Sequence, residues 1–186
     1  MPSPRYLSVG GGESPPRYGA SAIDNTFDSF YELHARTVFG YLWRMTGSEQ
    51  TAHDLTQETF VRAWNHFAKV QTYERPRSWL FRVATHLVIN HTQQLRRQPP
   101  LLNEEHERLL QVDDQTAGIA EQDAVLRILL RLRSRERAAL VLHAVLGFTC
   151  SEIARALGIS DANAKVTLWR AREHFRAYYG REEGES

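Results

Sequence analysis

Apolar residues recur at helical spacing in three stretches of the first half of the chain. The first stretch begins near Phe27 and ends at Gly47, and Ser48 can then cap a second helix. The third begins at Pro76, a residue suited to a first helical turn, and stops before Pro99. Three amphipathic helices over about seventy residues predict a small helical bundle.

The second of these helices has two different sides. Its buried side is predicted to carry Ala52, Leu55, Thr59, Ala63, Trp64 and Phe67. The opposite, outward side carries the polar residues Asp54, Gln57, Glu58 and Arg62. A loop from Ala68 to Glu74 is expected between this helix and the third.

The C-terminal part of the chain has the pattern of a helix-turn-helix. Thr149 and Glu152 stand in capping-box relation, so a helix is predicted to begin at about Cys150. Gly158 then supplies a left-handed turn residue, and Ser160 is a good N-cap for the next helix. In that next helix a basic face lies opposite a small or apolar stripe that packs inward. The basic face holds Lys165, Trp169, Arg172 and Arg176, and the inward stripe holds Ala164, Leu168, Ala171 and Phe175.

These patterns predict an all-α protein of two small helical domains joined by a flexible linker, the C-terminal domain being the helix-turn-helix. Residues 1–22, rich in Gly, Pro and Ser, are expected to be a disordered tail, and residues 23–97 form the helical bundle. Residues 98–119 are expected to be an acidic linker, because acidic residues outnumber basic ones there. Helical pattern resumes near residue 120, so residues 120–180 form the second domain and 181–186 a short tail.

Charge is segregated along the chain although the net charge is only +1. Residues 75–97 contain arginines and no Asp or Glu, and the acidic linker follows directly. Cys150 is the single cysteine, so an internal disulfide is excluded and a reducing cytoplasm is expected. The sequence has no apolar run long enough to insert into a membrane and no apolar signal segment at its start.

Two interpretations of the last two helices are open from charge alone. The helix after Ser160 can be a recognition helix that meets phosphates and base edges in a DNA major groove. It can also be part of an ordinary helical hairpin with a solvated basic face. The order of the signals favours DNA binding: a cap, a short helix, a Gly turn, an N-cap, and then no acidic residue between Asp161 and Glu173.

Several motifs together resemble a known family. The run from Asp54 to Trp64, Asp-Leu-Thr-Gln-Glu-Thr-Phe-Val-Arg-Ala-Trp, resembles a signature in region two of extracytoplasmic-function sigma factors, the group IV bacterial initiation factors. The similarity continues in family order through 79–84, 135–137, 152–154, 157–160 and 170–172. It covers about residues 27–179, and two weak motifs at the family's separation make a specific match.

The resemblance implies a transcription initiation factor that binds core RNA polymerase, directs it to promoters by recognising minus-10 and minus-35 elements, and aids DNA melting. Polymerase contact, at the beta-prime clamp, is expected from Asp54, Gln57, Glu58 and Arg62. Contacts to the minus-10 element are expected from Gln71, Tyr73, Arg75, Arg77, Arg82, His86, Asn90, Arg96 and Arg97, since capturing unpaired bases needs cations and flat surfaces. Contacts to the minus-35 duplex are expected from Asn163, Lys165, Trp169, Arg170 and Arg172.

Three positions depart from the family pattern as the resemblance gives it. His86 stands where Asn is usual, Asn90 where Asp is usual, and Thr167 where Arg is frequent. Residues 92–94, Thr-Gln-Gln, also stand where the family has a dense run of arginine, and fewer fixed positive charges mean fewer phosphate contacts. The departures therefore bear on promoter preference and strength of binding, and not on architecture.

No catalytic constellation or cofactor site is found in the sequence, and an enzyme is not expected. His86 and His91 are spaced onto different faces of one helix, which argues against a metal site. Two other classes stay open: a helix-turn-helix regulator that binds duplex DNA without polymerase, and a degenerate adaptor that binds polymerase but has lost promoter recognition. The motif from Asp54 to Trp64 argues against the first, and the intact series from Lys165 to Arg172 against the second. With no sensor domain in the chain, control by a separate anti-sigma factor is expected.

Overall fold

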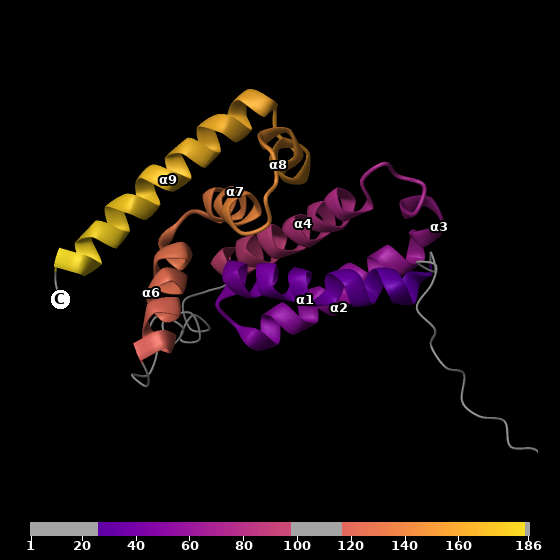
Figure 1. Ribbon diagram of the computed structural model, residues 1–186, viewed down its shortest axis with the longest axis horizontal. Helices are drawn as coiled ribbons and strands as arrows, with labels where there is room; N and C mark the ends of the chain where they lie inside the picture. The colour runs from indigo at the N-terminus through magenta and orange to yellow at the C-terminus, as the bar shows by residue number, and fades with distance from the viewer. Residues whose placement is uncertain (1–25, 98–116, 185–186) are drawn as a thin grey trace, which may run out of the picture.

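The structure is a computed structural model that describes residues 26–97 and 117–184, and within these ranges every regular element is helical (Figure 1). The helices are α1 Phe27–Thr46, α2 Glu49–Asn65, α3 Phe67–Val70, α4 Pro76–Arg97, α6 Ala117–Arg131, α7 Ser134–Ala144, α8 Cys150–Leu157 and α9 Asp161–Gly184. The predicted all-α class is confirmed. The predicted N-terminal tail and residues 98–116 of the predicted linker lie outside the described residues.

The first helical domain consists of α1, α2, the short α3 and α4. Ser48 caps α2 as predicted, because its hydroxyl accepts the Thr51 N–H at 3.2 Å. Gly47 ends α1 with a φ of 72°, a left-handed conformation that suits glycine. Inside the bundle, the hydroxyl groups of Tyr41 and Thr85 lie 2.8 Å apart and join α1 to α4 through a buried hydrogen bond.

Three features of this domain differ from the sequence prediction. Phe67, expected on the buried side of the second helix, instead begins α3 and is half-buried, because α2 ends at Asn65. Trp64 is 62% exposed and is not a core residue, since the buried stripe of α2 ends at Ala63 and one further residue turns about 100° around the helix. Its indole rests edge-on against Phe27, with ring centroids 4.9 Å apart. The first part of the expected loop from residue 68 to 74 is helical, because buried Val70 anchors α3 against the bundle.

The second helical domain consists of α6, α7, α8 and α9, and α8 and α9 form the predicted helix-turn-helix. The capping box at the start of α8 is present in both directions: Glu152 N–H donates to the Thr149 hydroxyl, and Thr149 N–H donates to the Glu152 carboxylate. Gly158 ends α8 with a φ of 65°. Ala164, Leu168 and Ala171 of α9 are buried, whereas α9 itself continues to Gly184, beyond the predicted end of the domain.

Helix α6 also begins earlier than expected, at Ala117 inside the predicted linker. The predicted boundary at residue 119 rested on the resumption of the helical pattern near residue 120. Alanine, however, is the best helix former, so Ala117 and Ala120 extend the helix towards the acidic segment.

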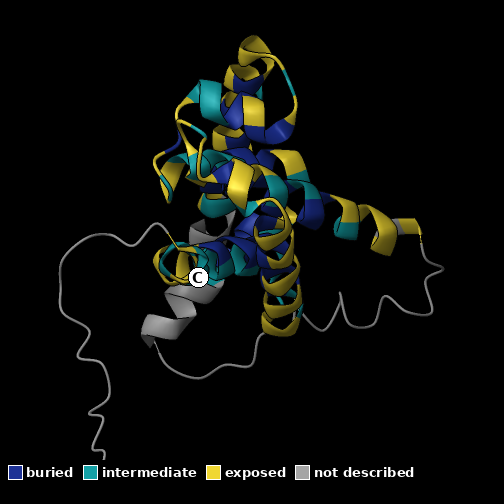
Figure 2. Cartoon of the chain, turned by 90° about the vertical axis from the view of Figure 1, so that its right-hand side faces the viewer, coloured by how far each residue is buried: buried dark blue, intermediate teal, exposed yellow. Residues whose placement is uncertain are grey.

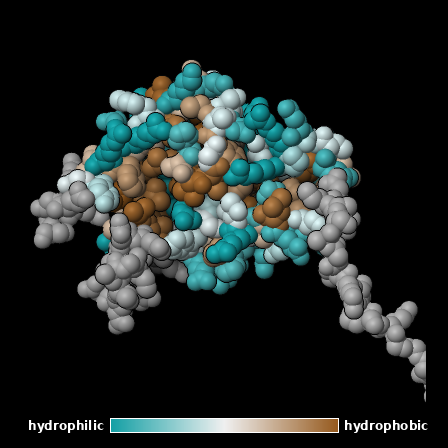
Figure 3. All heavy atoms as spheres, viewed as in Figure 1, coloured by the Kyte–Doolittle hydropathy of each residue, from teal (hydrophilic) through white to brown (hydrophobic). Residues whose placement is uncertain are grey.

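The two domains pack against each other and share one hydrophobic core (Figure 2). Helix α8 lies against α4, while α6 and α7 lie against α1 (Figure 1). The approach is close: a Cβ built on Gly47 would lie 2.7 Å from a methyl group of Leu130 in α6. Hydrophobic side chains still reach the surface in patches towards the middle of one face, among hydrophilic ones (Figure 3). The sequence did not predict this packing of the domains.

Arg137 connects three helices at the centre of this packing. It is 5% exposed, and its guanidinium donates to the carbonyl of Leu130 at 2.7 Å and to that of Leu132 at 3.1 Å, at the end of α6. It also donates to the carbonyl of Met45, in the last turn of α1. Carbonyl groups at a helix end have no partner within the helix, so a buried cation there supplies the missing hydrogen bonds.

We expect Arg137→Leu to lower the free energy of unfolding by about 2–4 kcal/mol, because buried carbonyl groups lose their donor. Urea unfolding followed by circular dichroism measures the change. Arg135→Leu, on the exposed side of the same helix, is the matched control and should stay within roughly 0.5 kcal/mol of the parent. Equal effects of the two variants would contradict the role given to Arg137.

Candidate protein and nucleic-acid interfaces

The outward side of α2 forms a mixed polar and apolar surface. Asp54, Gln57, Glu58 and Arg62 are all exposed there, as the sequence predicted for this side. Glu58 and Arg62 form an ion pair at 2.6 Å, and Gln50 donates a hydrogen bond to Asp54 at 3.2 Å. These contacts lie within one helix, so the side chains remain accessible to a partner.

Sequence reasoning missed two apolar members of this surface. Val61 is 58% exposed and Trp64 is 62% exposed, next to Glu58 and Arg62 on the same helix. A signal was present, because residues 57, 61 and 64 step by four and three and therefore share a helix face. Exposed aromatic residues among polar ones are typical of protein interfaces.

The loop between α3 and α4 places aromatic and cationic side chains around a small cavity. Tyr73 and Trp79 lie with ring centroids 6.4 Å apart, and Trp79 is half-buried. The cavity has a volume of about 230 Å³, and it is lined by Tyr73, Glu74, Arg75, Ser78, Trp79, Arg82 and Arg155. All of these residues belong to the first domain except Arg155, which comes from α8. The predicted loop residue Gln71 is exposed at the end of α3.

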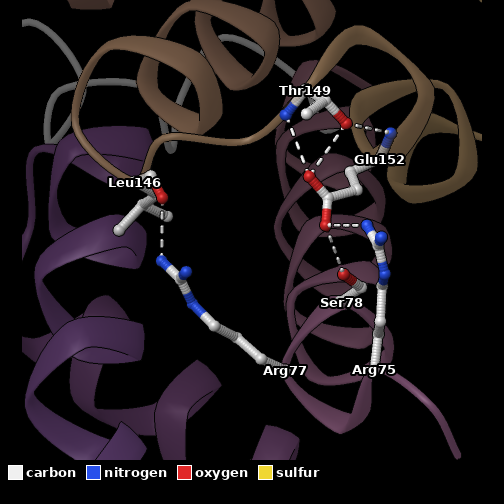
Figure 4. Close-up of polar contacts among 6 residues, drawn as sticks. All are labelled: Arg75, Arg77, Ser78, Leu146, Thr149 and Glu152. Carbon is white, nitrogen blue, oxygen red and sulfur yellow. Dashed lines mark hydrogen bonds and ion pairs between the residues drawn. The ribbon is translucent and has the colours of Figure 1, made fainter.

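Two arginines predicted to bind DNA, Arg75 in this loop and Arg77 in the first turn of α4, are in contact with the second domain (Figure 4). Nη1 of Arg75 lies 2.9 Å from Oε1 of Glu152. The Arg77 guanidinium donates to the Leu146 carbonyl at 2.9 Å and lies 5.0 Å from the ring centroid of Phe148. Both contacts join residues far apart in sequence, and no sequence pattern predicted them.

Glu152 is held as a carboxylate by its surroundings. Its pKa is lowered to about 2, first by the hydrogen bond from the Thr149 backbone N–H and further by the Thr149 hydroxyl and Arg75, against the opposing effect of burial. The two Thr149 bonds, each 2.9 Å long, use Oε2. Oε1 is left to accept from Arg75 and from the Ser78 hydroxyl at 3.3 Å.

The remaining residues predicted for the minus-10 element lie along α4. Arg82, Asn90 and Arg97 are exposed, and the side chain of Arg96 lies outside the described part. His86 is half-buried beside α8, where a Cβ on Gly158 would approach its Nε2 to 4.0 Å. Burial and the neighbouring Arg82 charge lower the pKa of His86, which favours the neutral ring. The structure thus turns His86 towards the second domain and leaves the other described residues on the surface.

The residues predicted for the minus-35 duplex are all exposed on α9: Asn163, Lys165, Trp169, Arg170 and Arg172. Trp169 is 62% exposed, which is unusual for tryptophan without a ligand or partner. The buried residues Ala164, Leu168 and Ala171 lie on the opposite side. The exposed side combines cationic, amide and aromatic groups, the chemistry that meets phosphates and base edges.

Among the described residues, no three His, Cys, Asp or Glu side chains are grouped so that they could hold a metal ion. None of the described helices has the length and apolar character needed to cross a membrane.

Comparison with known proteins covers both domains. A family model described as Sigma-70 region 2 matches residues 30–98, and one described as Sigma-70, region 4 matches residues 122–175. The ECF RNA polymerase sigma factor SigM of Bacillus subtilis is 28% identical over 158 residues, which are 84% of this chain and 96% of that protein. The ECF RNA polymerase sigma factor SigE of Mycolicibacterium smegmatis is 29% identical over 175 residues, 90% of this chain and 67% of that protein.

Solved structures share the fold. The sigma factor RpoE of Bartonella quintana, crystallised with the anti-sigma factor NepR, superposes with a TM-score of 0.66 at 18% identity, over 83% of this chain and 96% of that one. The extracytoplasmic function sigma factor SigJ of Mycobacterium tuberculosis superposes with a TM-score of 0.54 at 25% identity, over 80% of this chain and 52% of that one.

The charge of Glu152 should make a pH-dependent contribution to stability. Because its pKa falls from 4.5 to about 2 on folding, the contribution is present above 4.5 and is lost as the pH falls through about 2. Glu152→Gln should therefore unfold at a lower urea midpoint than the parent at about pH 7, and the difference between the two midpoints should be smaller at about pH 3. A difference in urea midpoint that does not change with pH would mean that Glu152 acts through its shape and not through its charge.

Proposed function

The chain belongs to the extracytoplasmic-function group of sigma-70 RNA polymerase sigma factors, and on that premise we propose which of its surfaces meets each partner. It is a promoter-specificity factor that binds core RNA polymerase, and it acts where polymerase and promoter DNA lie, in the bacterial cytoplasm. The match of both sigma regions in order carries this conclusion. A regulator that binds DNA without polymerase would leave the region 2 match, residues 30–98, without a purpose.

The exposed side of α2 is proposed as the polymerase-binding surface. Asp54, Gln57, Glu58 and Arg62 offer both signs of charge and an amide, and Val61 and Trp64 add exposed apolar area beside them. A polar rim around apolar side chains suits a protein partner better than a nucleic acid, because Asp and Glu repel phosphates. The expected partner is the beta-prime clamp of core polymerase.

The exposed side of α9 is proposed as the reader of the minus-35 duplex. Its N-terminal half carries Lys165, Trp169 and Arg170, and its first helical turns follow the Gly158 turn as in helix-turn-helix proteins. Asn163 and Arg172 flank these three residues. Thr167 adds no charge, so fewer phosphate contacts are expected than in relatives with arginine there.

Residues 71–77, called here the minus-10 loop, comprise the loop before α4 and the first two residues of α4, and they are proposed to capture unpaired bases of the minus-10 element. Tyr73 and the half-buried Trp79 provide flat surfaces beside the cavity, while Arg75, Arg77 and Arg82 provide cations for the backbone. His86, Asn90, Arg96 and Arg97 would extend this contact along α4.

Control by a separate anti-sigma factor is also proposed. The RpoE structure named above contains such a partner, NepR, and CnrH, another sigma factor of this fold, is seen with the cytosolic domain of CnrY. The described part of this chain holds the two sigma regions and no further folded unit that could sense a signal.

The polymerase surface can be tested by co-purification with bacterial core polymerase. The double variant Asp54→Ala, Gln57→Ala should bind core enzyme at least about tenfold more weakly, because two polar contacts at the centre of the surface are lost. Glu32→Ala, an exposed acidic position on α1, is the control and should bind as the parent does. Equal binding of parent and double variant would place the polymerase contact elsewhere.

The two DNA surfaces can be separated by their substrates. Arg170→Ala should weaken binding to a minus-35 duplex by roughly 1–3 kcal/mol if Arg170 reads a base edge. If Arg170 contacts a phosphate, the variant should instead lower the slope of log affinity against log salt concentration by about one.

The double variant Arg75→Ala, Arg77→Ala should leave binding to the minus-35 duplex intact and should form fewer open complexes. That defect should be relieved on templates already unpaired at the minus-10 element.

Permanganate footprinting on closed and pre-melted templates measures opening, and duplex binding is measured with the same preparations. Arg36→Ala, at an exposed position on α1 outside both proposed DNA surfaces, is the control for the loss of one arginine. Equal loss on both templates would mean general electrostatic attraction and not base capture.

A further inference from the structure

We propose that the second domain of this chain closes on its own minus-10 loop, and that Glu152 occupies on Arg75 the place of a promoter phosphate. The inference rests on the function proposed above for that loop. It adds a regulatory contact within the chain itself, which precedes any anti-sigma partner. The contact of Glu152 with Arg75 and Ser78 is called the Glu152 contact below.

The geometry of the Glu152 contact is that of a charge-assisted pair (Figure 4). Oε1 of Glu152 accepts from Arg75 Nη1 at 2.9 Å and from the Ser78 hydroxyl at 3.3 Å. Arginine binds carboxylate and phosphate oxygens with the same planar set of N–H donors. The carboxylate and a DNA phosphate therefore compete for the same side of Arg75.

Glu152 is also fixed in place before it meets Arg75. Its other oxygen, Oε2, is held by the backbone N–H and hydroxyl of Thr149 in the capping box. The side chain is only 15% exposed, while that of Arg75 is 53% exposed. A positioned, ionised acceptor loses little conformational entropy when the pair forms, so this pair should be stronger than a free surface ion pair.

Arg77 is engaged by the same domain in a different way. Its guanidinium donates to the Leu146 carbonyl at 2.9 Å and lies over two aromatic rings that contact each other, Phe148 at 5.0 Å and Phe81 at 5.7 Å. Phe148 comes from the second domain and Phe81 from the first, and both rings are buried. Two arginines proposed to meet the minus-10 element are thus both occupied by one corner of the second domain.

The closed arrangement also has an apolar basis. Phe148 and Ile153 of the second domain belong to the same buried cluster as Leu80 and Phe81 of α4. Opening must expose part of this surface to water, so it needs a partner that binds the open form more tightly. Core polymerase and single-stranded promoter DNA are the partners expected to do so.

The closure is selective among the DNA-binding surfaces. Lys165, Trp169 and Arg170 on α9 stay exposed while Arg75 and Arg77 are occupied. The free chain should therefore offer its minus-35 surface and withhold its minus-10 loop. If only a small fraction of the molecules is open, the apparent affinity of the minus-10 loop for DNA is reduced by that fraction. Weakening the closure should therefore raise the affinity for single-stranded DNA and leave the affinity for the minus-35 duplex unchanged.

Glu152→Gln tests this directly in the full chain. Gln also serves in a capping box, so α8 keeps its cap while the charge on Arg75 loses its partner. The probe is a fluorescent single-stranded oligonucleotide that carries the minus-10 sequence selected by this chain with core polymerase. Without polymerase, we expect its affinity to rise by about 3- to 10-fold, with minus-35 duplex affinity unchanged within about twofold. Small-angle X-ray scattering should show a larger radius of gyration.

Two further variants keep the test decisive. Glu32→Gln removes the same charge from an exposed site on α1 and should not change the affinity for the oligonucleotide. Ser78→Ala removes only the weaker hydrogen bond to Glu152 and should raise affinity in the same direction but less; it carries the test if Glu152→Gln does not fold. Unchanged affinity for single-stranded DNA, or an equal rise for duplex and single strand, would overturn the proposal.

Failure of the proposed function would look different. In that case neither parent nor Glu152→Gln would bind the minus-10 oligonucleotide even in complex with core polymerase. If both proteins bind it equally with and without polymerase, the function stands and the closure is wrong.

Discussion

The packing of the two domains depends on a buried cation at the ends of two helices. Arg137 sits in α7, yet its hydrogen bonds go to carbonyl groups at the end of α6 and to Met45 at the end of α1. Helix ends need external donors, and here a single guanidinium supplies them in both domains. Because hydrogen bonds in a buried site are directional, they fix the angle at which α6 and α7 meet α1, and α8 then falls against the start of α4.

That placement gives the two arginines proposed to bind DNA, Arg75 and Arg77, two alternative sets of partners. Within the chain, Arg75 meets a carboxylate and Arg77 meets a carbonyl and two aromatic rings. On a promoter, the same groups would meet phosphates and unpaired bases. The arginines find hydrogen-bond acceptors in either state, so the equilibrium between closed and open domains is set by other interactions that favour the open form. Polymerase binding would be such an influence, since its proposed surface on α2 is separate from the occupied loop.

Much of the local structure followed from sequence because local rules govern it. Ser48, the Thr149–Glu152 capping box and the glycines at positions 47 and 158 each mark a helix boundary through hydrogen bonds or φ values confined to a few residues. Trp64 shows where such rules stop. Its spacing fits both the edge of the buried stripe and the outward positions 57 and 61, and only the tertiary structure shows that it is 62% exposed, with its indole against Phe27.

The sequence by itself determined the all-α class, most helix ends, the helix-turn-helix and the residues proposed to meet polymerase and DNA. It could do so because caps, turns and amphipathic faces depend on neighbours within a few positions. Only the tertiary structure decided that the two domains share a core and that Glu152, a capping residue in sequence, also pairs with Arg75 across 77 positions. Such contacts depend on the relative orientation of rigid domains, and buried side chains such as Arg137, far from either motif, fix that orientation.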